Sequence, residues 1–357
     1  MGRIGDFLMA KTKYVAYVST YTRKNDKGIR IYDVDDKNGR LSEREQITIT
    51  NSSYLTISHN QKYIYSITDF GVESFRMTEN GGLEFINMAS INGMRGCYIS
   101  TDYTDKFMFV AGYHDGKITV LRLNDDGSIG EITDEVFHQG MGNISDRNFR
   151  PHVSCVKMTR DNKYLCACDL GLDHVKVYKF NAMTGTLKLE DAIRCEQDSA
   201  PKYIKFRKDG QYAYIINQMN CSIVVYKYSE INGHPDFEKV QKISTLNDYH
   251  TASCAACAMK LSMDNKYIFI SNAGDNSVGV FEIDDETGML TKKLVLPISG
   301  DYPKDIAVFP DCKHLVSLNH ESDTMTFFNV DINKGTLVMN GPEIKVAKGN
   351  TVTILKL

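Results

Sequence analysis

The segment at residues 149–153 carries residue types that could do chemistry. It reads FRPHV, so Arg150 and His152 flank a proline directly after the polar stretch GMGNISDRN. A histidine can accept a proton near neutral pH, and an arginine beside it can hold an anion. The segment also leads into a run typical of a strand, where a packed or capping histidine would be ordinary. Whether it forms a catalytic mouth or a loop entering a sheet depends on the plan of the whole chain.

The nine cysteines include two close pairs that resemble metal-ligand spacing. Cys166 and Cys168 stand in YLCACDL, and Cys254 and Cys257 stand in SCAACAM. A zinc site needs four convergent ligands, and no second pair follows at a matching spacing. We interpret all four as small buried side chains on strands, and we expect neither a metal nor another cofactor. An odd number of scattered cysteines indicates reduced thiols and a cytoplasmic location.

Composition argues against several kinds of partner. The 357 residues carry a net charge of -3, which leaves no large basic field for nucleic acid or an anionic membrane. No apolar run approaches the roughly 18 residues of a membrane-spanning helix. The first residues, MGRIGDFLMAKTK, have too short an apolar core for a signal peptide, and we expect residues 1–10 to form an N-terminal tail. The length allows two domains or one large repeat fold.

One phrase recurs along the chain: a polar turn, an aromatic residue and then alternating apolar residues. Its seven copies read TKYVAYVS, QKYIYSIT, DKFMFVAG, NKYLCACD, GQYAYIIN, NKYIFISN and CKHLVSLN. Their key positions are Tyr14, Tyr63, Phe107, Tyr164, Tyr212, Tyr267 and His314. The copies follow one another at about 50 residues, a period that indicates a repeat architecture.

Each copy contains further strands beside the recurring phrase. A second alternating run follows it, as in VKVYKF, and a turn with a late glycine and an apolar residue comes next, as in NAMTGTL. Another short strand precedes the phrase, as in PKYIKF. Four strands in about 50 residues describe one blade of a β-propeller. The sequence contains no tryptophan, which excludes the WD-dipeptide type of propeller.

The ends of the chain predict how the ring closes. The first copy begins with its second strand at Tyr14, and the last residues, NTVTILKL, supply one spare strand. We expect this spare strand to complete the N-terminal blade, which removes an open sheet edge. The sequence therefore predicts an all-β fold, a seven-bladed propeller of four antiparallel strands per blade. It forms a single domain over residues 11–357.

This topology brings the candidate residues together. The first and second strands of a blade form an antiparallel hairpin, so first-strand starts meet second-strand ends on one face of the ring. The two longest gaps between copies add HQGMGNISDRNF and STLNDYHTAS to that face, where functional loops are usual. Charged and amide residues expected at this mouth are Arg95, Arg150, His152, Asp169, Lys202, Asn217, Gln218, Lys304 and His320. Asp169 could instead close a turn, and the lysines could be solvated.

With these motifs the sequence resembles the seven-bladed lactonase propellers. That family includes the propeller-type bacterial 6-phosphogluconolactonases and the fungal 3-carboxy-cis,cis-muconate lactonizing enzymes. The resemblance runs from about Tyr14 to Leu357. Its motifs are Arg150-Pro151-His152, Asp169-Leu170-Gly171-Leu172-Asp173, Pro201-Lys202, Asn217-Gln218, Ser271-Asn272 and Pro303-Lys304-Asp305.

Three positions depart from the family's usual motifs. The family often has Pro-Arg-His, Asn-Glu and Ser-Asn-Arg-Gly where this chain has Lys202, Gln218 and Ala273. The glutamate and arginine positions look catalytic in the lactonizing branch. A glutamine cannot act as a general acid or base, and an alanine cannot hold a carboxylate. These departures weaken the lactonizing activity and leave hydrolysis open.

The resemblance implies hydrolysis of a sugar lactone, most like that of a 6-phosphogluconolactonase. We assign His152 as the base, and Lys202 or Arg150 as the contact for the oxyanion or phosphate. The expected substrate contacts are Asp169, Asn217, Gln218, Lys304, Arg95 and His320. The expected partner is a small sugar lactone, and the expected state is a monomer or weak homodimer. The alternatives are a catalytically degenerate propeller that binds a ligand or protein, and a muconate-type lactonizing enzyme.

Overall fold

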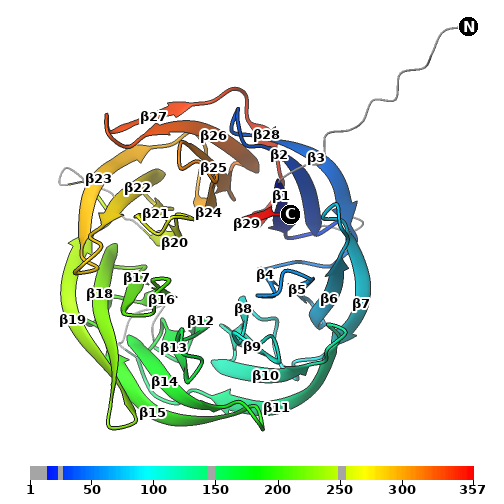
Figure 1. Ribbon diagram of the computed structural model, residues 1–357, viewed down its shortest axis with the longest axis vertical. Coiled ribbons are helices and arrows are strands. Elements are labelled where there is room, and N and C mark those ends of the chain that lie inside the picture. The colour runs from blue at the N-terminus through cyan, green and yellow to red at the C-terminus, as the bar shows by residue number, and fades with distance from the viewer. Residues whose placement is uncertain (1–13, 23–26, 143–148, 248–254) are drawn as a thin grey trace, which may run out of the picture.

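The computed structural model describes residues 14–22, 27–142, 149–247 and 255–357, and its regular structure there is entirely β-strand. Seven antiparallel sheets, each with a path of four strands, surround a common centre (Figure 1). We number these blades 1 to 7 from the sheet that contains the N-terminal strand. The predicted seven-bladed propeller is thereby confirmed. The predicted tail, residues 1–10, lies outside the described residues.

The strands occupy four positions in each blade, here in blade order from 1 to 7. The innermost are β29 (Gly349–Lys356), β4 (Leu55–Ile57), β8 (Tyr98–Thr101), β12 (Val153–Met158), β16 (Pro201–Phe206), β20 (Ala256–Leu261) and β24 (Pro303–Val308). The second are β1 (Tyr14–Thr20), β5 (Tyr63–Thr68), β9 (Phe107–Gly112), β13 (Tyr164–Asp169), β17 (Tyr212–Asn217), β21 (Tyr267–Asn272) and β25 (His314–Asn319).

The outer half of each blade is formed by two further strands. The third are β2 (Ile29–Asp35), β6 (Gly71–Met77), β10 (Lys117–Leu123), β14 (His174–Asn181), β18 (Ser222–Ile231), β22 (Ser277–Ile283) and β26 (Thr324–Asp331). The outermost are β3 (Arg40–Ile47), β7 (Leu83–Ala89), β11 (Ile129–Phe137), β15 (Thr186–Arg194), β19 (His234–Ser244), β23 (Leu290–Pro297) and β27 (Thr336–Met339). A short strand, β28 (Ile344–Lys345), also pairs with β26.

Burial falls from the second strand outward. Strands β9, β13 and β17 are buried at every residue, because each lies between two strands of its own sheet and between two neighbouring blades. The outermost strand β15 is mostly exposed, as expected for a strand at the edge of a sheet. Within the described part of the chain, no helix is long and apolar enough to cross a bilayer.

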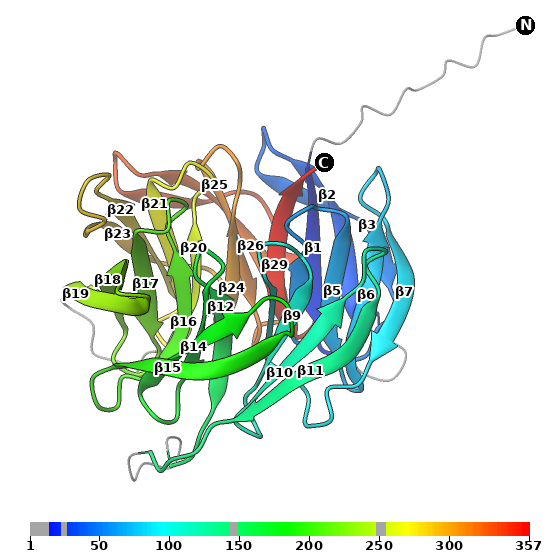
Figure 2. The same ribbon diagram turned by 60° about the horizontal axis from the view of Figure 1, so that its bottom comes forward.

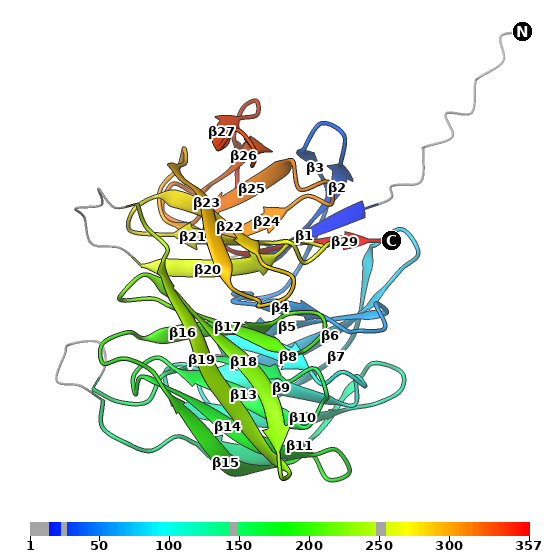
Figure 3. The same cartoon turned by 60° about the vertical axis from the view of Figure 1, so that its left-hand side comes forward.

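The C-terminal strand closes the ring. Strand β29 pairs antiparallel with β1, with Val18 opposite Val352, and the Ser19 and Thr351 hydroxyls are 2.8 Å apart. Figure 2 and Figure 3 show the two strands side by side. The last strand of the chain is therefore the innermost strand of blade 1, as the sequence predicted.

Adjacent blades are joined where an aromatic residue meets a glycine turn. At four of the seven junctions, the first residue of a second strand packs under the glycine of the turn between the third and outermost strands of the next blade. A Cβ atom added to that glycine would lie within 2.5 Å of the ring in four such contacts: Tyr63 with Gly127, Phe107 with Gly185, Tyr212 with Gly288 and His314 with Gly39. These contacts explain why the recurring aromatic residue and the late glycine appear together in the repeat.

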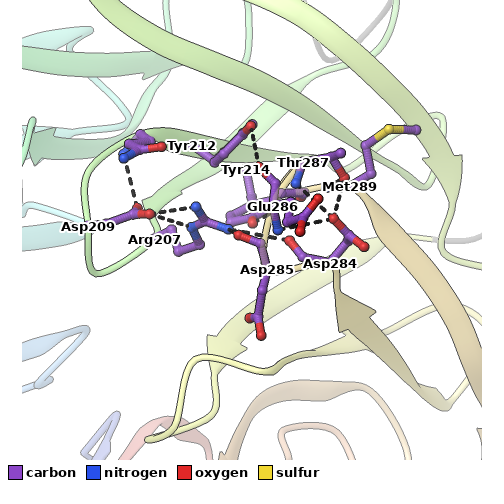
Figure 4. A network of polar contacts seen from close by, with 11 residues as sticks. Arg207, Asp209, Tyr212, Tyr214, Asp284, Asp285, Glu286, Thr287 and Met289 are labelled. Carbon is purple, nitrogen blue, oxygen red and sulfur yellow. Dashed lines mark hydrogen bonds and ion pairs between the residues drawn. The ribbon is translucent and has the colours of Figure 1, made fainter.

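Between blades 5 and 6 the same contact is reinforced by hydrogen bonds (Figure 4). The hydroxyl of Tyr214 donates to the carbonyl oxygen of Gly288 at 3.1 Å, and that of Tyr212 to Glu286 at 3.1 Å. The guanidinium of Arg207 lies over the Tyr212 ring and donates to the Asp285 carbonyl oxygen at 2.9 Å. The turn at residues 284–289 is thus fixed to the preceding blade by both packing and polar contacts.

The glycine contact predicts a position-specific loss of stability. Gly288 has φ +65 and no room for a Cβ, whereas Gly233 has φ +81 and no heavy atom within 4 Å of an added Cβ. Gly233→Ala should cost about 1 to 2 kcal/mol for its left-handed backbone. Gly288→Ala should cost about 1 to 3 kcal/mol more, because it also overpacks the Tyr212 ring. Urea unfolding midpoints of the two variants measure the difference, and equal midpoints would contradict the proposed role of the contact.

Candidate active site in the channel mouth

A bulge near the start of five of the seven innermost strands turns one extra side chain toward the channel. In β12, β16, β20, β24 and β29 the pairing with the second strand skips the second residue of the innermost strand. Such bulges re-aim side chains and are common beside active sites. The skipped residues are Ser154, Lys202, Cys257, Lys304 and Asn350. With Ser53 and Cys97, which precede β4 and β8, they form a ring of one residue from each blade, here called the mouth tier.

All seven mouth-tier residues line a cavity of about 350 Å³. The cavity lies where innermost strands begin and second strands end, as the sequence predicted. Among the described residues that line it, Asp305 is the single carboxylate, against the cations Arg95, Lys202, Lys205, Lys260 and Lys304. Asp305 is already engaged, because its Oδ2 accepts from Lys260 Nζ at 2.9 Å. The excess of positive charge suits an anionic ligand.

Two of the cations share one aromatic ring. The Arg95 guanidinium and the Lys304 ammonium lie 4.8 and 4.7 Å from the centroid of the Tyr21 ring. Arg95 also pairs with Asp69 at 2.8 Å, and Lys304 donates to Asn350 Oδ1 at 2.6 Å. Burial, together with repulsion from Lys202 and Arg95, lowers the pKa of Lys304 to about 8.

Lys202 faces a thiol. Its ammonium donates to Cys257 Sγ at 3.1 Å. Burial alone would lower the pKa of Lys202, but its interactions with Cys257, Tyr302 and Cys97 together outweigh burial and raise this pKa. Cys257 was predicted to be a small buried side chain, and it is indeed buried on β20, yet it also lines the cavity. Cys166 and Cys168 are fully buried on β13, whereas Cys254 lies outside the described residues. No group of three His, Cys, Asp or Glu side chains in the described ranges could hold a metal ion.

His152 is buried next to the cavity but is not one of its lining residues. Its ring stacks on Tyr113, which does line the cavity, with centroids 4.3 Å apart. Its Nδ1 lies 2.7 Å from the carbonyl oxygen of Tyr113. A carbonyl oxygen can only accept, so Nδ1 carries the proton and Nε2 is the nitrogen that can act as a base.

Asp169 holds the loop around His152. One of its oxygens accepts backbone N–H groups from His152, Gly171 and Leu172, at 2.9 to 3.1 Å. The other lies 2.6 Å from Nδ1 of His138, and both side chains are fully buried. Burial lowers the pKa of His138 despite this carboxylate. Asp169 is therefore placed to shape the site from behind and is not among the cavity-lining residues.

The structure divides the predicted site residues into two groups. Those that line the cavity are Arg95, Lys202, Gln218 and Lys304. Those that do not are Arg150, His152, Asp169, Asn217 and His320. Arg150 is exposed over the Phe149 ring, and Asn217 is buried against Ser222. His320 lies at the rim, where its ring meets that of Tyr21 edge-on and its Nδ1 faces the Gly349 carbonyl oxygen.

Several lining residues were not predicted as site residues. They include the exposed His114 and the aromatic residues Tyr21, Tyr54, Tyr113 and Tyr203. Deeper in the cavity are Lys205 and Lys260. Aligning the repeats at Lys202 and Lys304 would have identified Cys257 and Asn350, because all four occupy the bulge position.

Comparison with known proteins agrees with this architecture. A family model for the lactonases, described as seven-bladed β-propellers, matches residues 15–354. The chain belongs to this lactonase family. It is 28% identical to a 6-phosphogluconolactonase of Bacillus subtilis, over 92% of this chain and 94% of that one. It is also 28% identical to a 6-phosphogluconolactonase of Formosa agariphila, over 90% of this chain and 94% of that one.

A solved structure gives the same result. The structure of a Bacteroides fragilis protein provisionally assigned as a 6-phosphogluconolactonase superposes with a TM-score of 0.86 at 27% identity. The match covers 97% of this lactonase-family chain and 98% of the Bacteroides protein. Lactone hydrolysis is therefore supported at the level of the family.

The repulsion between cations at the mouth predicts that Lys304 lowers the stability of the folded protein. The pKa of Lys304 is about 8 in the folded protein, below the ordinary 10.5. The charged form of Lys304 therefore lowers the free energy of unfolding by its full amount below pH 8, and this destabilisation decreases as the pH rises from 8 to 10.5. Lys304→Met should therefore stabilise the protein at pH 7 by on the order of 1 to 3 kcal/mol. The gain should shrink as the pH rises from 8 toward 10. Urea unfolding at several pH values tests this, with the exposed Lys227→Met as the control, and a destabilised Lys304→Met at pH 7 would contradict it.

Proposed function

We propose that this protein hydrolyses a phosphorylated sugar lactone of the 6-phosphogluconolactone type in the mouth cavity. The observation that carries the proposal is the charge of the cavity. Arg95, Lys202 and Lys304 all line it, and none of the mouth-tier residues is a carboxylate. A neutral lactone would not need this cluster, whereas a phosphate dianion would balance it. The two curated relatives named as 6-phosphogluconolactonases support the same substrate class.

The size and polarity of the cavity fit such a ligand. About 350 Å³ is at the small end of ligand cavities and suits a six-carbon sugar with one phosphate. Ser53, Ser154 and Gln218 offer hydroxyl and amide groups to the sugar hydroxyls, and Tyr54 and Tyr203 offer apolar ring faces.

Hydrolysis needs a base and a group that stabilises negative charge. Water adds to the lactone carbonyl carbon, the carbonyl oxygen becomes an oxyanion, and the ring C–O bond breaks as the ring oxygen takes a proton. Lys202 is our choice for the oxyanion contact, because its raised pKa keeps it charged. His152 is our choice for the base, because the Tyr113 carbonyl fixes its tautomer. His114, which lines the cavity directly, is the competing base.

Location and pathway follow from this substrate class as further proposals. A phosphorylated sugar lactone would place the protein in the cytoplasm and in pentose phosphate metabolism. The binding-module alternative remains open because a cationic cavity also suits binding without turnover. For the lactonizing alternative, Ala273 is buried outside the cavity lining and offers no charge for a carboxylate.

The two histidines can be separated by activity. If His152 is the base, His152→Gln should reduce kcat for 6-phosphogluconolactone by roughly 100-fold or more, while His114→Gln stays within a few-fold. The exposed His234→Gln serves as the control. A pH-stat assay corrected for spontaneous hydrolysis gives the rates. The reverse pattern would move the base to His114, and full activity in both variants would favour the binding module.

The cations can be tested by substrate choice. Lys304→Ala should raise KM for the phosphorylated lactone more than KM for gluconolactone, because only the former carries the dianion. Lys202→Ala, which removes the oxyanion contact, should instead reduce kcat for both lactones. Lys227→Ala on β18, which removes an exposed lysine, should change none of these values. A loss in Lys202→Ala confined to the phosphorylated lactone would move Lys202 to the phosphate, and no loss on either lactone would contradict its place in the site.

A further inference from the structure

A second set of lysines lies deeper in the channel. The innermost strands of blades 4, 5 and 6 carry a lysine at the same register: Lys157 opposite Cys166, Lys205 opposite Tyr214 and Lys260 opposite Phe269. We call these three residues the lysine tier. In the other blades the equivalent positions are neutral, with Thr56, Ser100, Ala307 and Thr353. Positive charge is thus concentrated on one side of the channel.

The lysine tier is distinct from the mouth tier. Lys202 and Lys205 lie three residues apart on β16, which corresponds to roughly 7 to 10 Å along a strand. A cluster of tyrosines intervenes on part of the ring: Tyr98 lies 4.4 Å from Tyr54 and 5.6 Å from Tyr203, measured between ring centroids. On blade 6 the intervening residue is the small Ala258, and Ala258, Lys205 and Lys260 all line the cavity. Lys205 and Lys260 are therefore reached from the mouth beside Ala258.

Only one lysine of this tier has an acidic partner among the described residues. Lys260 donates to Asp305 at 2.9 Å and to the Val352 carbonyl oxygen at 3.3 Å. For Lys157 the contact within the described ranges is the Tyr103 ring, 5.8 Å away, and Arg160 lies over the same ring at 5.3 Å. Three ammonium groups against one carboxylate leave two positive charges in excess, a balance that a phosphate dianion would complete.

Electrostatic strain at the tier agrees with this geometry. Burial, with repulsion from Lys205 and Arg160, lowers the pKa of Lys157 to about 7. Burial and Lys260 lower the pKa of Lys205 as well, despite Asp305 and the Cys155 thiol. Beside Tyr103, burial lowers the pKa of His59, and Lys157 adds to this. A bound anion would relieve the repulsion among these groups.

We propose that the lysine tier is a second anion-binding site, which takes a phosphate-class oxyanion between Lys157 and Lys205. The anion is either free inorganic phosphate or the phosphate group of a ligand that reaches down from the mouth. The site does not depend on hydrolysis, so its test uses binding alone and stands whether or not the protein proves to be a lactonase.

Calorimetric titration with inorganic phosphate at pH 6, where Lys157 is protonated, tests the site directly. The background is the Lys202→Met/Lys304→Met variant, which removes the mouth lysines. In that background, phosphate should still bind, and adding Lys205→Met or Lys157→Met should weaken it by about tenfold or more. Binding should also weaken between pH 6 and pH 8.5 as Lys157 loses its proton, and this pH dependence should disappear in Lys157→Met. The exposed Lys227→Met is the matched control.

A second pair of titrations distinguishes the two sources. If the tier holds the phosphate of a larger ligand, Lys205→Met in the otherwise native protein should weaken 6-phosphogluconate but not gluconate, and inorganic phosphate should compete with 6-phosphogluconate. If it holds free phosphate, both should bind together, and Lys205→Met should affect phosphate alone. Either result supports the site. Circular dichroism confirms folding, and Lys205→Gln replaces any variant that fails. Phosphate affinity unchanged by Lys157→Met and Lys205→Met in the mouth-lysine background would overturn it.

Discussion

The architecture depends on a contact that recurs at four of the seven junctions between blades. At each of these junctions, the ring of the residue that begins a second strand fills the space that a glycine leaves open in the neighbouring turn. A blade alone cannot bury that ring, so the contact is satisfied only between blades. Because His314 meets Gly39, the same contact also links the last blade to the first. At these junctions the repeat therefore specifies both the strands of a blade and the way the blade packs against its neighbour.

The site follows from this arrangement. A rigid ring holds the innermost strands, and a bulge in five of them directs an extra residue toward the axis. Cations from blades 5 and 7 are thereby held near one another although they repel, and the pKa of Lys304 records the cost. Packing between blades supplies the stability that allows the channel to keep unfavourable charges.

Much of the fold was predictable from the sequence, whereas the site was predictable only in part. The recurring phrase and the spare strand NTVTILKL predicted seven blades and their closure, because strand period and ring closure are local and topological constraints. The position of Lys202 and Lys304 at strand starts was enough to place them in the mouth. For His152 and Asp169, the position in the sequence did not decide whether the side chain lines the cavity, because the same loop can present its side chains to the cavity or to the core. Lys205 was missed since the bulge at Lys202 breaks the strict alternation that identifies inward-facing residues.

The pairing of β29 with β1 has a consequence for biosynthesis. Strand β1 ends at Thr20, yet its inner neighbour β29 begins only at Gly349 and is translated much later. At the usual 5–20 residues per second, synthesis of the chain between them takes roughly half a minute. During that interval the nascent chain presents an unpaired strand edge, which is prone to pair with other chains. The ring cannot close before β29 has left the ribosome, so the first blade is the last to be completed, and protection of strand β1 by chaperones is most useful until then.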